Sequence, residues 1–174
     1  MRKLIVAVCA LMLCSLYALA GDQPNTPKAE FFGGYQFTHL EGTGSANGFN
    51  FAVNGNFSDT FGITGDFAAA YKTQGGVSYN NYTYTFGPVL SLRANKAYTP
   101  FVHALIGGDH GSASVPGASA SGNGFALMAG GGVDANFARH LAFRVAQVDW
   151  MMVHGSGGTS GKNYRISTGI VFRY

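Results

Sequence analysis

The sequence has no cysteine beyond its first twenty residues, because its two cysteines are Cys9 and Cys14. The rest of the chain therefore needs no disulfide framework and has no thiol chemistry. After residue 20 it also lacks any apolar run of the roughly 20 residues that a membrane-spanning helix needs. Charge of either sign is sparse, with 11 basic and 8 acidic residues. This near balance removes the electrostatic case for a nucleic-acid partner.

The first twenty residues have the pattern of a secretory signal peptide. Arg2 and Lys3 form a short basic region, and an apolar run follows over residues 4–19. Ala18-Leu-Ala20 has the small residues of a cleavage site. The run is shorter than an anchor helix of about 20 residues, so we predict export and cleavage before Gly21.

Eight segments of alternating polar and apolar residues follow, bounded by clusters of Gly, Ser, Asn and Pro. Each has about the length that a tilted strand needs to cross the hydrocarbon of a membrane. The predicted strands are Ala29–Leu40, Gly48–Asn56, Phe61–Lys72, Tyr82–Arg93, Pro100–His110, Asn123–Ala135, Leu141–Val153 and Asn163–Tyr174.

The predicted connections alternate between short and long, and the long ones are rich in Gly, Ser and Asn. Short periplasmic turns opposite longer extracellular loops are typical of an outer-membrane barrel. Both ends of the barrel are then expected on the periplasmic side. The short turns are Phe57–Thr60, Ala94–Thr99 and Asn136–His140, and the long loops are Glu41–Asn47, Thr73–Asn81, Gly111–Gly122 and Gly155–Lys162.

The last twelve residues carry the clearest facial pattern. Arg165 and Arg173 lie on one face of the predicted strand, and apolar or aromatic residues dominate the other. An apolar face backed by an arginine-bearing face is typical of a strand between lipid and a polar lumen. A soluble sandwich would alternate in the same way, and the export signal, the loop asymmetry and this terminal strand decide against it. The outward face is Tyr164, Ile166, Thr168, Ile170, Phe172 and Tyr174.

In these features the chain resembles the small eight-stranded outer-membrane barrels of the OmpA and OmpX type, often described as porin-family proteins. Arg144–Trp150 and Arg165–Tyr174 are the segments most similar to the last two strands of such barrels. The resemblance implies an all-β, antiparallel, up-and-down transmembrane β-barrel over residues 29–174. A signal peptide over residues 1–20 and a periplasmic leader over residues 21–28 would precede it. No peptidoglycan-binding domain of the long OmpA type is expected.

The resemblance also implies a place and partners. The place is the outer membrane of a Gram-negative envelope, where the barrel would contact lipid and lipopolysaccharide. Periplasmic chaperones and the barrel-assembly machinery would deliver it, and the family's terminal aromatic sorting signal falls on Phe172 and Tyr174. The sequence names no partner for the extracellular loops.

Charged residues with lumen-facing parity are expected to pair with one another. The interior of an eight-stranded barrel is just wide enough for side chains to fill, and unpaired charge in a dry interior is costly. We therefore predict a lumen sealed by salt bridges and a structural or adhesive role, with a small, low-conductance porin as the alternative. The predicted network is Glu30, Asp66, Arg93, Asp134, Arg144, Asp149, Arg165 and Arg173.

Two details of this network are specific. Arg144 differs in parity from Gln147 and Asp149 on the same strand, and one extra residue would turn all three inward. We therefore predict a β-bulge near Val145–Ala146. Glu30 and Arg173 are expected side by side across the seam between the first and last strands.

Catalysis is a remote alternative that rests on His154 and Ser156. This pair resembles the base and nucleophile of barrel enzymes that modify lipid A. A base of this kind needs a third group to orient its imidazole, and no Asp or Glu follows Ser156. The five histidines are scattered without metal-ligand spacing. We therefore expect neither enzyme activity nor a metal or other cofactor.

Overall fold

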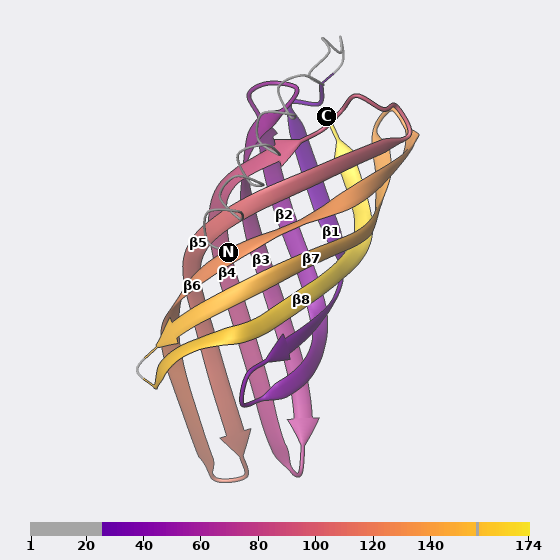
Figure 1. Ribbon diagram of the computed structural model, residues 1–174. Coiled ribbons are helices and arrows are strands. Elements are labelled where there is room, and N and C mark those ends of the chain that lie inside the picture. The colour runs from indigo at the N-terminus through magenta and orange to yellow at the C-terminus, as the bar shows by residue number, and fades with distance from the viewer. Residues whose placement is uncertain (1–25, 156) are drawn as a thin grey trace, which may run out of the picture.

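The computed structural model describes residues 26–155 and 157–174. The predicted signal peptide, most of the predicted leader and Ser156 lie outside the described residues. Eight antiparallel strands form a closed barrel in which each strand pairs with its sequence neighbours and β8 returns to β1 (Figure 1). The predicted all-β, eight-stranded, up-and-down barrel is confirmed. The strands are β1 Ala29–Leu40, β2 Gly44–Asn56, β3 Phe61–Gln74, β4 Val77–Ser91, β5 Tyr98–Val115, β6 Ala118–Ala138, β7 Leu141–Gly155 and β8 Gly158–Arg173.

The barrel is polar inside and apolar outside. Successive side chains of a strand point to opposite faces, so buried Arg165 on β8 is flanked by exposed Tyr164 and Ile166. A soluble protein keeps such apolar side chains inside, whereas a transmembrane barrel turns them toward lipid. Within the described residues, no helix is long and apolar enough to cross a membrane.

Exposed aromatic side chains mark two levels of the outer surface. Phe31 on β1 lies opposite Phe172 on β8 near the end that holds the C-terminus. Trp150 on β7 lies opposite Tyr164 on β8 at the other level, and its indole Nε1 donates a hydrogen bond of 2.6 Å to the Gly161 carbonyl. Rings of this kind are typical of the interfaces between hydrocarbon and water.

The ends of the barrel lie together, as an even number of strands requires. The C-terminus and the start of β1 are at the same end of the barrel (Figure 1). The Ala29 and Tyr174 backbones bond reciprocally, with N···O distances of 3.0 and 2.8 Å. Strand pairing therefore continues to the last residue.

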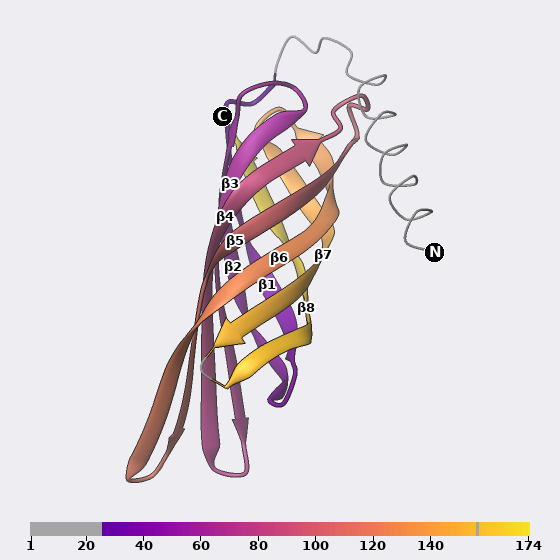
Figure 2. The same ribbon diagram turned by 60° about the vertical axis from the view of Figure 1, so that its left-hand side comes forward.

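The prediction of four long loops is wrong, because most of their residues continue the strands. β5 and β6 pair up to Val115 and Ala118, so residues 111–122 form a hairpin with a two-residue turn. β3 and β4 pair up to Gln74 and Val77. Figure 2 shows both hairpins projecting beyond the shorter β1–β2 and β7–β8 turns. Runs of Gly, Ser and Ala have no apolar face, so the sequence pattern did not reveal their pairing.

The β3–β4 turn shows why glycine is needed at such a tip. Gly75 and Gly76 have φ angles of 61° and 80°. A two-residue turn of this type matches the twist of its strands only when both residues have positive φ. At the other end, β4 stops at Ser91 rather than the predicted Arg93, which lies in the following connection.

Candidate functional site

The lumen holds the eight charged residues named from the sequence, and the structure joins them through hydrogen bonds. Four carboxylates face four guanidinium groups, so the network is formally neutral. Their side chains are almost entirely shielded from solvent, from Asp149 at 0% exposed to Arg93 at 9%. Burial of this degree requires that each charge have a partner.

The part of the network nearest the C-terminus centres on Glu30. Its carboxylate accepts a hydrogen bond from Nη2 of Arg93 at 2.8 Å and another from Nε of Arg173 at 2.7 Å. Glu30 and Arg173 lie directly opposite each other on β1 and β8, so the predicted contact across the closing seam is present. Arg173 also approaches Asp134 at 3.5 Å, and Asp134 accepts Nε of Arg144 at 2.8 Å.

The middle of the lumen centres on Arg165, whose side chain is 1% exposed. Its Nη1 lies 2.8 Å from Oδ1 of Asp66, and its Nη2 lies 2.7 Å from Oδ2 of Asp149. Asp66 comes from β3, on the opposite side of the lumen from β7 and β8. Arg165 therefore joins distant strands of the barrel through two charge-assisted contacts.

Two further side chains, Gln147 and His103, complete the network. Gln147 accepts from Nη1 of Arg144 at 2.6 Å and donates to Oδ2 of Asp149 at 2.8 Å, which links the two parts. Nε2 of His103 lies 2.7 Å from Oδ1 of Asp149. His103 was not predicted as a member, although its inward position between Phe101 and Leu105 on β5 was visible in the sequence.

The predicted β-bulge on β7 is confirmed. Asp134 of β6 pairs with Arg144 and Val133 with Ala146, so Val145 is the extra residue. Val145 and Ala146 both point outward, whereas Arg144 and Gln147 are 3% and 1% exposed. The bulge thus turns Arg144, Gln147 and Asp149 all into the lumen.

Glycine at position 130 of β6 makes room for the buried carboxylate of Asp149 on the neighbouring strand. A Cβ at Gly130 would lie 2.1 Å from Oδ1 of Asp149. Any larger residue there would displace Asp149 from His103 and Arg165. The missing side chain at Gly130 on β6 and the buried carboxylate of Asp149 on β7 therefore depend on each other for packing.

An apolar cluster lies beyond the network, toward the end of the barrel opposite the C-terminus. Leu105, Met128 and Met151 are buried together, and Leu40 packs against them. Met128 contacts the network, since its sulfur lies 3.3 Å from Nη2 of Arg165. Along the barrel axis, the lumen is thus filled first by the charged network and then by this apolar cluster.

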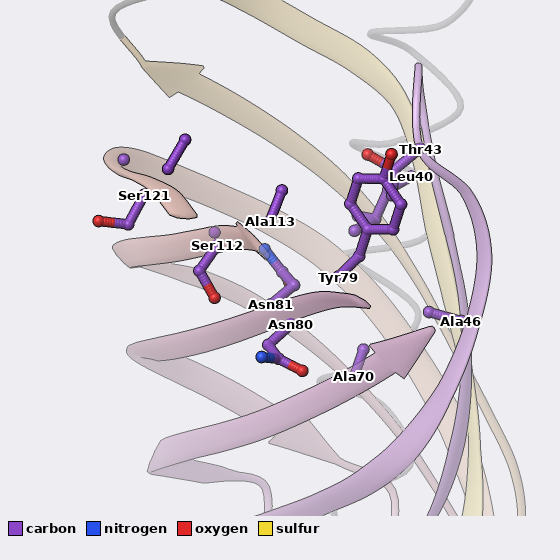
Figure 3. A pocket seen from close by; sticks show the side chains of 13 residues that line it. Leu40, Thr43, Ala46, Ala70, Tyr79, Asn80, Asn81, Ser112, Ala113 and Ser121 are labelled. Carbon is purple, nitrogen blue, oxygen red and sulfur yellow. The ribbon is translucent and has the colours of Figure 1, made fainter. Parts of the chain in front are cut away.

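A cavity of about 320 Å³ lies beyond this cluster, at the end of the lumen opposite the C-terminus (Figure 3). Its walls come from β1 to β6 and the β1–β2 turn, and most of its lining side chains are small and uncharged. In Figure 3 the Tyr79 ring stands beside Leu40 and Thr43, across the cavity from Ser112 and Ser121. The lining is Leu40, Thr43, Ala46, Ala70, Tyr79, Asn80, Asn81, Gly111, Ser112, Ala113, Ala120, Ser121 and Gly122.

The remaining predicted residues lie outside the lumen. The His154 ring is exposed, and its Nδ1 lies 2.6 Å from Oγ1 of Thr159 across the β7–β8 hairpin. Its predicted partner Ser156 lies outside the described residues. Phe172 and Tyr174 are 59% and 83% exposed, at the C-terminal end of β8. Over residues 26–155 and 157–174, no group of three or more His, Cys, Asp or Glu could hold a metal ion.

Comparison with known proteins agrees with this architecture. The Ail attachment invasion locus protein of Yersinia pestis is 21% identical with a TM-score of 0.61, over 85% of this chain and 99% of that one. Neisserial surface protein A is 11% identical with a TM-score of 0.67, over 84% and 96% of the two chains. The outer membrane protein OprG of Pseudomonas aeruginosa is 12% identical with a TM-score of 0.58, over 86% and 97%.

At these identities the likeness concerns the fold. No curated protein sequence matches the chain. The family model for the outer membrane protein beta-barrel domain matches residues 6–173. Taken with the closed barrel and its apolar exterior, this match shows that the chain belongs to the outer membrane protein beta-barrel domain family, whose place is the bacterial outer membrane.

Proposed function

We propose that the protein is a non-catalytic surface-interaction protein, an adhesin whose barrel is sealed and whose extracellular hairpins make the contact. The observation that carries this proposal is the continuous network from Glu30 to Asp66 across the lumen. A solute would have to separate buried ion pairs there, and breaking one costs roughly 3–5 kcal/mol. The apolar cluster of Leu105, Met128 and Met151 adds a second barrier above it.

The projecting hairpins support the contact role. β6 pairs with β7 only from Gly124 onward, so residues 118–123 pair with β5 alone. They form a free strand edge without charge or proline. The unpaired backbone groups of such an edge can add a strand from a partner. The name of the similar Ail protein refers to attachment and invasion, which is in line with a contact role.

Export and assembly complete the proposal. Residues 1–20 are removed on export, and residues 21–28 remain as a leader in the periplasm. Phe172 and Tyr174 present the terminal strand to the barrel-assembly machinery after periplasmic chaperones deliver the chain. Lipopolysaccharide covers the outer leaflet around Tyr71, Trp150 and Tyr164, whose exposed rings stand at that level.

Conductance tests the sealed lumen. The refolded protein in a planar lipid bilayer should give no stable openings, because the network and the apolar cluster fill the lumen. A large open porin in the same bilayer serves as the positive control. Stable openings of small, uniform size would instead establish the low-conductance porin as the correct function.

The strand edge makes a separate prediction for adhesion. Bacteria displaying the double variant Ser119→Lys/Ser121→Lys should attach less to cultured epithelial cells, because lysine on an edge strand opposes strand addition. The matched control is Ser112→Lys/Ser114→Lys, since these residues pair with Ser121 and Ser119 but lie inside the sheet. Equal loss in both variants would mean that added charge, not the edge, reduces attachment.

A further inference from the structure

Asp109 on β5 is a lumen-facing carboxylate outside the charged network. It is 8% exposed, and its Oδ2 accepts a hydrogen bond of 2.7 Å from Nδ2 of Asn81. Within the part of the chain that the structure describes, no lysine, arginine or histidine forms an ion pair with it. The four lumen guanidinium groups already serve the four network carboxylates.

His110 on β5 and Lys72 on β3 have other partners. Nδ1 of His110, on the opposite face of β5, lies 2.7 Å from Oδ1 of Asn123. Nζ of Lys72 donates to the carbonyl of Thr43 at 2.5 Å, in the β1–β2 turn that lines the cavity. A buried carboxylate without a cation is costly. Asp109 is therefore an incomplete ion pair at the extracellular end of the lumen.

Asp109 lies behind the wall of the extracellular cavity, which its partner Asn81 lines. Gly111, two residues along the same face of β5, and Asn81, the partner of Asp109, both line it. No acidic or basic side chain lines its wall. In Figure 3 the Asn81 amide and the Tyr79 ring stand on neighbouring parts of one wall. Alanines form much of the remaining surface, and about 320 Å³ is the size of a small-molecule site.

We propose that this cavity binds a small organic cation, a primary amine with a short aromatic or apolar body. The ammonium group has three donors, one of which the Asn81 side-chain oxygen accepts. Asp109, which holds the Nδ2 of the same amide, supplies the negative charge behind the cavity wall. The body lies against Tyr79, whose ring also attracts positive charge, and against the alanine methyl groups. A divalent metal fits less well, because calcium takes about six to eight oxygen ligands and the described residues offer no acidic cluster.

Tyramine and 4-ethylphenol test the role of the ammonium group, because the two molecules share one body. Each is titrated into the refolded full-length chain in an uncharged detergent and followed by calorimetry. Tyramine should bind at least about ten-fold more tightly, as expected for one hydrogen bond to a charged group. Equal affinities, or no tyramine binding at millimolar concentration, would overturn the proposal.

Two carboxylate variants locate the site. Asp109→Asn keeps the shape of the side chain and should weaken tyramine binding by about ten-fold. Glu41→Gln removes an exposed carboxylate at the same end of the barrel and should leave binding unchanged. Tyramine binding that survives Asp109→Asn would contradict the assignment. If that variant does not fold, the wild-type comparison of the two probes still decides, and neither result depends on whether the lumen conducts.

Discussion

Replacing Arg165 by methionine should lower the free energy of unfolding by about 3–5 kcal/mol. The Arg165 guanidinium is buried and contacts Asp66 at 2.8 Å and Asp149 at 2.7 Å. Methionine would fill much of the space but leave two buried carboxylates without their shared cation. The measurement is urea unfolding in lipid vesicles, followed by the fluorescence of Trp150, the single tryptophan.

Three further variants separate the ion pairs from other effects. Lys162→Met removes an exposed cation, 87% accessible and 3.9 Å from Glu41, and should leave stability unchanged because exposed pairs contribute little. Arg165→Lys should recover only part of the lost stability, since one ammonium group cannot donate to both carboxylates with the planar geometry of a guanidinium. Adding Asp66→Asn and Asp149→Asn to Arg165→Met should restore part of the stability. Wild-type stability of Arg165→Met alone would show that the network does not hold the barrel together.

The barrel could be predicted because a strand has a side-chain period of two. On β8, Arg165 and Arg173 share one parity and the aromatic residues share the other. The even position of Arg144 and the odd position of Asp149 on one strand were equally informative. Both side chains could face inward only if the strand held one extra residue. The seam between β1 and β8 followed from closure, which placed Glu30 and Arg173 at the same depth.

Contacts across the lumen could not be predicted in the same way. Arg165 and Asp66 lie 99 positions apart, and their meeting depends on the tilt and stagger of the closed sheet. His103 was overlooked because a single histidine in an apolar segment gives no charge pattern. The lengths of the projecting hairpins were also hidden, because Ser, Ala and Gly can occupy either face of a strand or a loop.

Deleting Val145 should largely prevent folding and membrane insertion. Without the extra residue, one half of β7 must turn over, because a shift of one position exchanges the two faces of a strand. Turning the first half places Arg144 against lipid, at a cost of up to about 2–4 kcal/mol, and breaks its pair with Asp134. Turning the second half removes Gln147 and Asp149 from the network. The measurement is the fraction of heat-modifiable folded protein in the membrane.

Two controls assign the cause of that loss. Val145→Ala keeps the bulge and shortens only a lipid-facing side chain, 51% exposed, so folding should remain near that of the wild type. Combining the deletion with Arg144→Val separates the two outcomes. If the first half turns over, this change removes the charge from lipid and should restore part of the folding, although Asp134 still lacks Arg144. If the second half turns over, Asp149 still loses its contacts with Arg165 and His103, and folding should remain poor. A deletion variant that folds as the wild type does would show that the bulge is dispensable for the placement of these charges.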